Sequence, residues 1–446
     1  MSDVQNFHNF QILPQIDKIL NHEKFKGLNK GILTKIARQS LNQIRENFIK
    51  FNFSNQDEVM DFILEKYKKF QRKSLQNVIN LTGIIIHTNL GRTPISSLLW
   101  DEAKELVCNY SNLEFDLDEN KRSNRYDESG FLLSALFGCQ DALVVNNNAA
   151  AVFLVLNTFG ADGECVLSRG ELVEIGGGFR VPEVMAKSGA KLVEIGTTNK
   201  TRLKDYQNAV TENTKMLLKI HRSNFEIVGF CEETSLENIA NLGKEKNILT
   251  YYDLGGGAAL KSPILGSEPV VENLIKTGVD LLSFSGDKLF GSVQAGIILG
   301  KKELIAKLRS NQLLRMLRCD KTCLALLNLS LKAYLDKKYE KIAILELLNR
   351  STNELEKIAK SINSKISNIA QIIHTSTFVG GGTMPNHKIP SIALAFSGDI
   401  KSIEADFRKK NVIGRIENES FILDLRSLLP SNENKLISVI NEIFAR

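Results

Sequence analysis

The sequence predicts an α/β protein: a large domain on a mostly parallel sheet, a small α+β domain at the C-terminus and a small helical domain at the N-terminus. Two observations support this prediction. Apolar residues in the first 75 positions recur at helical spacing, whereas from about Asn77 short apolar runs alternate with helical stretches and glycine-rich turns. We therefore expect domains at residues 1–75, 76–324 and 325–446, the last beginning with a linking helix.

The composition is that of a soluble globular protein. The chain has 446 residues, of which 43% are hydrophobic and 24% charged, so neither disorder nor coiled coil describes the whole. No apolar run approaches the roughly 18 residues of a membrane helix, and the first residues lack a signal-peptide pattern. We expect a cytoplasmic protein without membrane association. The six cysteines form no paired CxxC motif, which argues for reduced thiols; they stand at positions 108, 139, 165, 231, 319 and 323.

The first 75 residues read as short amphipathic helices with basic outer faces. Leu33, Ile36 and Leu41 follow helical spacing, and another helix is expected after a Ser54 cap. The segment contains 13 Lys and Arg against 8 Asp and Glu, a net of +5, while the whole chain carries +6. This asymmetry indicates an acidic partner such as nucleic acid, although lysines on a solvated helix face would give the same count. The basic positions that lie between the apolar residues of these two helices are Lys35, Arg38, Arg45, Lys66, Lys68, Lys69, Arg72 and Lys73.

Seven short apolar runs are expected to form the strands of the large sheet. Ligands of such sheets bind beyond the carboxyl ends of the strands, and Asp253, Lys288 and His221 each fall at that end of a run. Two further runs, at 392–396 and 421–425, are assigned to the C-terminal domain. The seven runs cover residues 142–145, 164–167, 191–195, 216–220, 248–252, 281–284 and 296–299.

Lys288 and Asp253 form the most informative pair. In Ser285-Gly-Asp-Lys288 an apolar run exits into a turn, where a lysine can lose enough water to become an amine nucleophile. Asp253 ends another run 35 residues upstream. A lysine that bonds the cofactor and an acid that keeps the pyridine nitrogen protonated are what pyridoxal 5'-phosphate requires. Either residue alone is more often a cap or a surface group, but together they favour a pyridoxal phosphate enzyme.

A phosphate cradle is expected at Asn147, Asn148 and Ala149, where a strand ends and small residues let a helix begin close to an anion. An asparagine-rich helix cap would look the same. The Ser285 hydroxyl, three residues before Lys288, could reach the same phosphate. Among the histidines, His221 is the one expected to touch the cofactor, since His221-Arg-Ser-Asn follows an apolar strand.

Three arginines suggest a second anion site. Arg92 ends the turn region that begins at His87, and Arg315 and Arg318 share a helix face if their segment is helical. The guanidinium fork donates two hydrogen bonds at once, which suits tetrahedral oxyanions, although solvated arginine pairs are common. His87 is the histidine expected to touch a substrate. No spacing of histidines or cysteines matches a metal motif, so no metal is expected.

These segments, in this order, resemble the bacterial selenocysteine synthases, also called L-seryl-tRNA(Sec) selenium transferases. The resemblance covers most of the chain, while residues 1–75 fit by type and position rather than by motif. Residues 120–125 depart from the glycine-rich loop of the family, and 290–294 depart from its Gly-Gly-Pro-Gln pattern. The matching stretches are 78–92 (ending His87-Thr-Asn-Leu-Gly-Arg92), 110–116, 144–151, 168–177, 194–199, 284–288 (Phe284-Ser-Gly-Asp-Lys288), 380–383, 412–416 and 423–426.

The resemblance implies pyridoxal phosphate fold type I, the aspartate-aminotransferase-like fold, in a homo-oligomer whose dimers assemble into a larger ring. It implies a cytoplasmic transferase of selenocysteine biosynthesis, and so of protein biosynthesis, that converts L-seryl-tRNA(Sec) to selenocysteinyl-tRNA(Sec). A β-elimination would leave dehydroalanyl-tRNA, to which selenophosphate adds selenium. Lys288 would hold the cofactor and Asp287 would assist or orient it. Arg92, Arg315 and Arg318 would bind selenophosphate, and the N-terminal domain would bind tRNA.

Two other functions remain open on the sequence. A pyridoxal phosphate lyase acting on a small free amino acid or an amino-sugar phosphate would share the lysine site but would lack a tRNA-binding domain. A non-catalytic RNA-binding relative would keep the fold without the cofactor, and the presence of Lys288 and Asp253 argues against it. The net charge of residues 1–75 and the three arginines favour a tRNA substrate.

Overall fold

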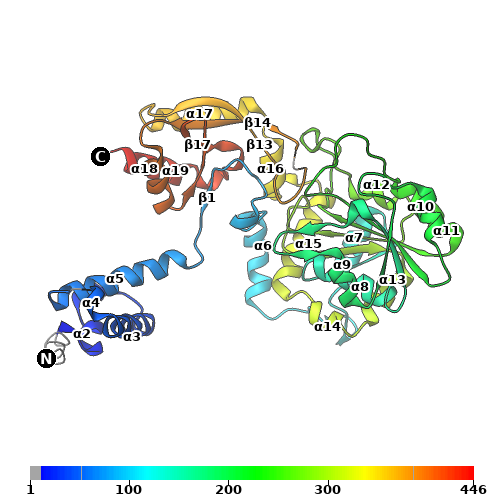
Figure 1. Ribbon diagram of the computed structural model, residues 1–446, viewed down its shortest axis with the longest axis horizontal. Helices are drawn as coiled ribbons and strands as arrows, with labels where there is room; N and C mark the ends of the chain where they lie inside the picture. Colours follow the sequence, from blue (N-terminus) through cyan, green and yellow to red (C-terminus); the bar gives the residue numbers. More distant parts are fainter. Residues whose placement is uncertain (1–11, 52, 385, 446) are drawn as a thin grey trace. The chain divides into compact units, whose positions relative to one another are not determined.

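The computed structural model describes residues 12–51, 53–384 and 386–445. The chain divides into two compact units, Met1–Asn77 and Val78–Arg446, whose helices and strands are labelled in Figure 1. The first unit is helical, and the second is an α/β unit that contains a large and a smaller sheet. The α/β class expected from the sequence is confirmed.

The first unit is built on two long helices, α3 and α5, which pack against each other around a core that includes Ile19, Leu33 and Ile63. Each is amphipathic, with its buried residues at helical spacing, so burying that stripe is what makes the helices stable together. The α-helices among the described residues of this unit are α2 (Ile16–Leu20), α3 (Lys30–Glu46), α4 (Phe48–Phe51) and α5 (Gln56–Lys73).

The start of α5 differs by one residue from the prediction. Asn55, not Ser54, is the N-cap, and its side-chain oxygen accepts a hydrogen bond from the Glu58 N–H at 3.0 Å. The Ser54 N–H donates instead to Oε2 of Glu58 at 2.8 Å. Asparagine and serine cap helices about equally well, so local sequence does not choose between neighbours. The Glu58 carboxylate points back over the first turn of α5 and accepts the hydrogen bond of the Ser54 N–H.

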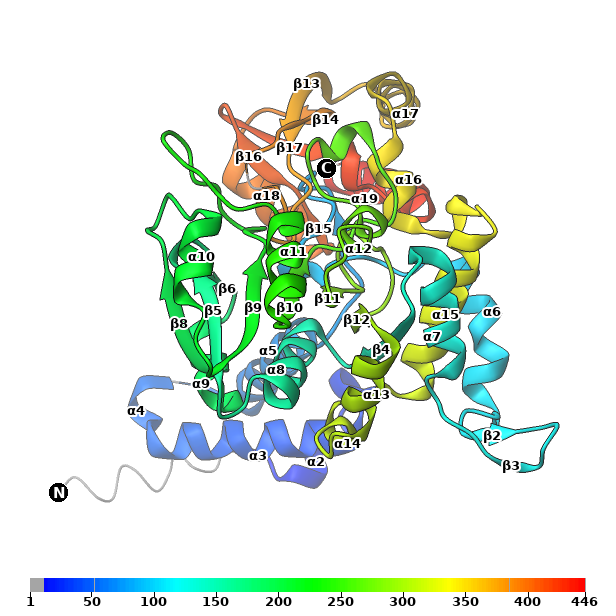
Figure 2. The same cartoon turned by 90° about the vertical axis from the view of Figure 1, so that its right-hand side faces the viewer.

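The large sheet of the second unit has seven strands in the order β4-β12-β11-β10-β9-β5-β8, and Figure 2 shows β8 and β4 at its two edges. Only β12 runs antiparallel to its neighbours β11 and β4, so the sheet is mostly parallel, as expected. The strands are β4 (Asp141–Val145), β5 (Glu164–Ser168), β8 (Lys191–Ile195), β9 (Thr214–Ile220), β10 (Leu249–Gly255), β11 (Leu281–Ser285) and β12 (Gly296–Gly300).

Helices cover both faces of this sheet, and alternate residues of a strand point to opposite cores. Tyr251 of β10 lies in the core beneath α8, whereas Tyr252 lies in the core on the opposite face. By the same alternation Asp253 belongs to the α8 face. The helices packed around the two cores are α6 (Ser97–Cys108), α7 (Asp127–Phe137), α8 (Asn148–Phe159), α9 (Val181–Ser188), α10 (Leu203–Ala209), α11 (Leu236–Lys246), α12 (Val271–Ile275), α13 (Lys302–Ser310), α15 (Lys321–Leu335) and α16 (Ala343–Asn349).

The C-terminal part of the unit holds a four-stranded antiparallel sheet in the order β13-β14-β17-β16. The early strand β1 (Ile79–Asn80) pairs in parallel with β15 (Val412–Ile413), and Ile79 is buried in the C-terminal core. The chain that follows residue 77 therefore enters the C-terminal core first, whereas the sequence-based prediction assigned this segment to the large domain of residues 76–324. The other elements are β13 (Gln371–Thr377), β14 (Ile389–Phe396), β16 (Arg415–Glu417), β17 (Ser420–Asp424), α17 (Thr352–Lys365), α18 (Ile400–Lys409) and α19 (Glu433–Phe444).

Candidate active site

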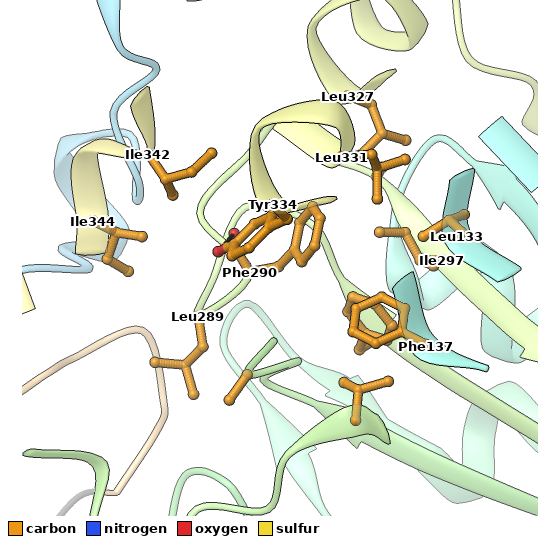
Figure 3. Close-up of a cluster of buried hydrophobic side chains, with 14 of the residues drawn as sticks. Leu133, Phe137, Leu289, Phe290, Ile297, Leu327, Leu331, Tyr334, Ile342 and Ile344 are labelled. Carbon is orange, nitrogen blue, oxygen red and sulfur yellow. Dashed lines mark hydrogen bonds between the residues drawn. The ribbon is translucent and has the colours of Figure 1, made fainter. Parts of the chain in front are cut away.

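Lys288 lies in the turn that follows β11, and its backbone is held at its own carbonyl and at the two residues that follow. Oγ1 of Thr93 donates a hydrogen bond to the Lys288 carbonyl at 3.0 Å. Leu289 and Phe290, which follow, are buried in the core shown in Figure 3. There the Tyr334 hydroxyl donates to the Phe290 carbonyl at 2.7 Å. Anchoring of these two neighbours fixes where the lysine side chain projects.

The Lys288 amine is suited to act as a nucleophile. The residue is only 7% exposed. Burial lowers the pKa of its ammonium group, the Asp253 carboxylate opposes that effect, and the Arg92 guanidinium adds to it. A lowered pKa enlarges the fraction of neutral amine, which is the form that attacks a carbonyl carbon or accepts a proton.

Asp253 lies near the end of β10 and is tied to the start of α8. The Asn148 side-chain amide donates to Oδ1 of Asp253 at 2.8 Å, and the His221 N–H donates to the Asp253 carbonyl at 2.8 Å. The carboxyl group is buried, and burial raises its pKa despite the Asn148 bond. Asn148 thus orients the acid; its amide, expected in a phosphate cradle, is directed to the carboxylate.

The start of α8 faces the same end of the sheet as Lys288. Asn147 is the N-cap, and its side-chain oxygen accepts from the Ala150 N–H at 2.9 Å. Asn148 and Ala149 open the helix, where N–H groups lack intrahelical acceptors. A Cβ on Gly296 would lie 2.2 Å from the Asn147 carbonyl oxygen, so glycine is needed for this approach. Ser285 pairs with Gly296 and lies on the α8 face of β11, which brings it to the predicted cradle.

Arg92 is joined to Asp287, the residue before the lysine. Nη1 of Arg92 lies 2.6 Å from Oδ2 of Asp287. The backbone N–H of Arg92 donates a hydrogen bond to the His87 carbonyl at 2.9 Å. Arg92 has a φ of 61°, a left-handed conformation that costs a side-chain-bearing residue roughly 1–3 kcal/mol. The ion pair holds the guanidinium beside Asp287, next to the lysine, and the sequence analysis did not foresee this pairing.

Arg315 and Arg318 do not share a helix face, contrary to the sequence-based expectation. α14 (Leu314–Leu317) ends before Arg318, which is its C-cap with an extended ψ of 143°. The chain leaves the helix because the Asn146 N–H donates to the Leu317 carbonyl at 2.8 Å, a contact with the loop before α8. Arg318 therefore lies one residue from that loop, while Arg315 is exposed on the helix.

Among the described residues, Arg318 and Arg92 have different partners. Nη1 of Arg318 lies 3.8 Å from Oε1 of Glu114, which is bound more closely by Arg125. Arg92 pairs with Asp287. One chain thus does not bring the predicted guanidinium groups onto a common partner.

The two predicted histidines have different neighbours. His87 precedes Arg92, and burial lowers the pKa of its ring, which favours the neutral imidazole. Nε2 of His221 lies 3.5 Å from Oε2 of Glu268, whose side chain is only 2% exposed. Glu268 was missed by the sequence analysis, because a single glutamate in a loop before a short helix carries no local signal.

A cofactor of the predicted kind fits these residues. A Cβ on Gly255 would lie 3.9 Å from Nζ of Lys288, so the glycine keeps open the space beside the amine. Buried polar atoms are nearly always paired, yet several around this turn have no partner among the described residues. Lys288 would bond pyridoxal phosphate, Asp253 would hold its ring nitrogen, and Asn147, Ala149 and Ser285 would receive its phosphate. The unpartnered atoms are His87 Nδ1, Asn146 Oδ1, Asn148 Oδ1, Asn224 Oδ1 and Asp287 Oδ1.

Two other kinds of site find no support in the part of the chain that the structure describes. It holds no group of three or more His, Cys, Asp or Glu side chains placed to bind a metal ion. None of its helices combines the length and apolar character needed to cross a bilayer.

The fold and the lysine site define a pyridoxal-phosphate-dependent enzyme of fold type I. The solved structure of D-glucosaminate-6-phosphate ammonia-lyase matches 85% of this chain and 99% of its own with a TM-score of 0.58 at 17% identity, a likeness of fold. The family model described as L-seryl-tRNA selenium transferase matches residues 78–429, and the chain belongs to that family.

Relatives in the family span almost the whole chain. An L-seryl-tRNA(Sec) selenium transferase of Campylobacter concisus is 53% identical over 445 residues, covering 99% of each chain. One of Campylobacter fetus is 53% identical, covering 96% of this chain and 97% of its own. One of Nautilia profundicola is 49% identical, covering 97% and 98%. The likeness therefore includes the N-terminal helical unit, which lies outside the family model.

Proposed function

We propose that the protein converts L-seryl-tRNA(Sec) to selenocysteinyl-tRNA(Sec) with selenophosphate as the selenium donor. In the net reaction the Cβ–O bond of the seryl group and the P–Se bond of selenophosphate break, a Cβ–Se bond forms, and the oxygen that leaves the serine as water is taken up by phosphorus, so that phosphate is released. The observation that carries the proposal is the buried Lys288 amine facing the buried Asp253 in a chain of this family. The earlier alternative of a non-catalytic relative does not explain why two ionisable groups are kept buried at a cost.

The residues around Lys288 divide the chemistry among them. When bound, pyridoxal phosphate supplies an electron sink for negative charge at the substrate Cα. Lys288, with its lowered pKa, takes the proton from Cα. Asp253, oriented by Asn148, holds the proton of the ring nitrogen. Asp287, with one oxygen on Arg92 and the other unpartnered among the described residues, orients or relays the proton of its neighbour.

We assign the selenophosphate site to Arg92, Arg315 and Arg318. Each guanidinium carries five N–H donors, so Arg92 keeps donors free after its bond to Asp287. Arg318 stands beside the loop that starts α8, and Arg315 is exposed one turn earlier. Because the partners of Arg92 and Arg318 differ within one chain, a site for one tetrahedral anion requires side-chain movement or a second copy of the chain.

The N-terminal helical unit is assigned to tRNA binding. Its basic side chains on α3 and α5 are exposed, except Lys66, which is half-buried with its ammonium 5.0 Å from the Phe62 ring centre. None of the eight predicted basic residues is ion-paired with a carboxylate among the described residues. Unpaired cations on one small unit release counterions when they meet phosphates, which is the main source of nucleic-acid affinity.

We further propose that the protein is a homo-oligomer of the cytoplasm. Large apolar side chains are exposed on α6 and on the hairpin of β2 (Phe115–Asp116) and β3 (Lys121–Arg122), including Trp100, Leu106 and Phe115. Burying such a surface against a second copy would remove it from water. We infer dimers that assemble into a larger ring, and the mass of the purified protein in solution tests this.

The first test joins cofactor chemistry to substrate. The protein is incubated with pyridoxal phosphate, reduced with borohydride and digested, and the modified peptide is identified by mass. We expect the added mass on Lys288, and full loss of it in Lys288→Ala. The matched control Lys276→Ala, an exposed lysine ion-paired with Glu272, should label normally. Labelling that persists in Lys288→Ala would overturn the lysine assignment.

The substrate is tested in the same preparations. With seryl-tRNA(Sec) and selenophosphate the wild type should yield selenocysteinyl-tRNA, and Lys288→Ala should yield none while shifting tRNA in a gel as the wild type does. Release of ammonia from a free amino acid or an amino-sugar phosphate, without reaction of seryl-tRNA, would replace the proposal by the lyase alternative.

A further inference from the structure

A cavity of about 520 Å³ lies at the carboxyl ends of β9 and β10, on the face of the sheet opposite α8. It is formed by the ends of these strands, the loop after β9, the loop before α12 and the segment before β14. Cavities of this size hold small ligands or parts of larger ones. No step of the chemistry assigned above uses it. The lining residues central to its chemistry are His221, Phe225, Tyr252, Glu268, Asn386 and His387.

Only a turn without side chains separates this cavity from the Lys288 amine. A Cβ on Gly255 would lie 3.9 Å from Nζ of Lys288, and a Cβ on the next residue, Gly256, would lie 2.7 Å from Oε1 of Glu268. The lysine and Glu268 therefore approach neighbouring residues of the same turn. The turn of Gly255 and Gly256 thus lies between the lysine amine and the Glu268 carboxylate.

Glu268 provides the polar group that a ligand would meet there. Its side chain is 2% exposed, and Oε2 lies 3.5 Å from Nε2 of His221. Oε1 is buried and has no partner among the described residues. Leaving a buried carboxylate oxygen unpaired is costly, so a ligand that donates a hydrogen bond is favoured. Carboxylates accept from ribose hydroxyls in this manner at dinucleotide sites.

The charges of the lining do not suit an anion such as selenophosphate. Lys219 and Arg222 are the lysine and arginine of the lining, and both are ion-paired with Glu233. Together with Glu226 and Glu268 the lining holds three carboxylates against these two cations. The Phe225 ring, 37% exposed, offers a face on which a base can stack, and Glu226 and Asn386 form a hydrogen-bonded pair at 2.9 Å. These features fit a neutral nucleoside.

We propose that this cavity binds the terminal adenosine of the substrate tRNA, with Glu268 accepting a hydrogen bond from the ribose hydroxyl next to the seryl ester. The ester joins the serine to that ribose, so a seryl group at Lys288 and a ribose at Glu268 are a few bonds apart. The inference rests on the proposed function and adds to it the part of the tRNA that is read nearest the reaction.

The test uses three stable ligands with the full-length, cofactor-loaded protein. They are 3'-(L-serylamino)-3'-deoxyadenosine, its 2'-deoxy form and L-serinamide, and each is titrated by the change in the visible spectrum. We expect the adenosine ligand to bind at least about tenfold more tightly than serinamide. Removing the 2'-hydroxyl should weaken it roughly tenfold, the size of a charge-assisted hydrogen bond.

Variants then link the effect to the residues. In Glu268→Ala the affinities for the adenosine ligand and for its 2'-deoxy form should be equal. In Phe225→Ala the ratio of the affinity for the adenosine ligand to the affinity for serinamide should fall severalfold. The affinity for serinamide itself should not change in either variant. Glu237→Gln, on the exposed side of α11, is the control and should match the wild type. A 2'-hydroxyl effect of equal size in wild type and Glu268→Ala would overturn the assignment.

The two proposals fail in different ways. If the adenosine ligand binds no better than serinamide while seryl-tRNA is still converted, the cavity assignment alone is wrong. If seryl-tRNA is not converted, the proposed function is wrong. The comparison of the three ligands on the wild type needs no variant, so a misfolded Glu268→Ala would not prevent the decision.

Discussion

The guanidinium of Arg92 lies 2.6 Å from the carboxylate of Asp287, and the next residue is Lys288. The two partners are 195 positions apart in the chain, and Asp287 is the more buried of them. The pair ties the turn of residues 87–92 to the lysine turn. An arginine proposed to bind substrate is thereby held in place by the residue next to the lysine proposed to hold the cofactor.

The role of Arg92 can be tested with variants that separate the effect of its positive charge from the effect of its planar set of guanidinium donors. Arg92→Lys keeps a cation near Asp287 but loses the planar set of donors, so we expect the KM for selenophosphate to rise at least about tenfold. Arg92→Ala should also destabilise the protein by about 1–3 kcal/mol, because Asp287 is left unpaired. Steady-state kinetics and denaturant unfolding measure the two effects. Arg408→Ala, an exposed arginine of α18 that pairs with Glu404, is the control; an unchanged KM in Arg92→Lys would leave Arg92 with a purely structural role.

Asp253 should give the cofactor-free protein a defined pH dependence. Burial raises the pKa of this carboxyl group above its usual value in the folded state. As pH rises from about 4 towards that folded pKa, the unfolded chain has already lost its proton while the folded protein retains it. The free energy of unfolding should therefore fall across this window relative to Asp253→Asn.

The variant keeps an acceptor for Asn148, so it isolates the ionisation. Denaturant unfolding at several pH values between 4 and 7 measures the difference between the two proteins. With cofactor and substrates, the kcat of Asp253→Asn should be at least about 100-fold lower than that of the wild type, which is the size of effect expected when a catalytic proton is no longer held in place. A wild type and variant whose stabilities stay parallel across the window would show that the carboxyl group titrates normally.

The basic face of α5 should control tRNA affinity through salt. Replacing Lys68, Lys69, Arg72 and Lys73 by glutamine should weaken binding and lower the slope of log affinity against log salt by roughly one per lost phosphate contact. The catalytic constant at saturating tRNA should not change. Four exposed lysines of the second unit, replaced together, serve as the control: Lys187, Lys244, Lys302 and Lys401. An equal change of slope in both sets would assign the effect to net charge alone.

Gly257 should be far less replaceable than another glycine of the same conformation. Its φ is 77°, and a Cβ there would lie 2.2 Å from Cδ2 of the buried Phe284, whereas Gly177 has a φ of 82° and nothing within 4 Å. Both alanine variants bear the strain of a left-handed residue, so their difference isolates the packing clash. We expect Gly257→Ala to be about 1–3 kcal/mol less stable than Gly177→Ala in denaturant unfolding. Equal stabilities of Gly257→Ala and Gly177→Ala would mean that the side chains around Phe284 rearrange at little cost in free energy.

Local pattern was sufficient for the strands and for the central pair of the site. Strands β4, β5, β11 and β12 are buried along almost their whole length, and such strands are visible in the sequence because a strand covered on both faces is apolar nearly throughout. Asp253 and Lys288 could be predicted because strand ends of a parallel sheet meet at one edge. The sequence by itself therefore determined the fold class and the placing of a lysine and an acid at one end of the large sheet.

Tertiary structure decided what depends on contacts between distant residues. The parallel pairing of Ile79 with Val412, the ion pair of Arg92 with Asp287 and the burial of Glu268 beside His221 each join segments that share no periodicity. The end of α14 before Arg318 was likewise set by a bond from Asn146 to Leu317 rather than by helix propensity. Periodicity records which face of an element is buried, but not which distant group lies against it, and that choice is made only when the chain packs.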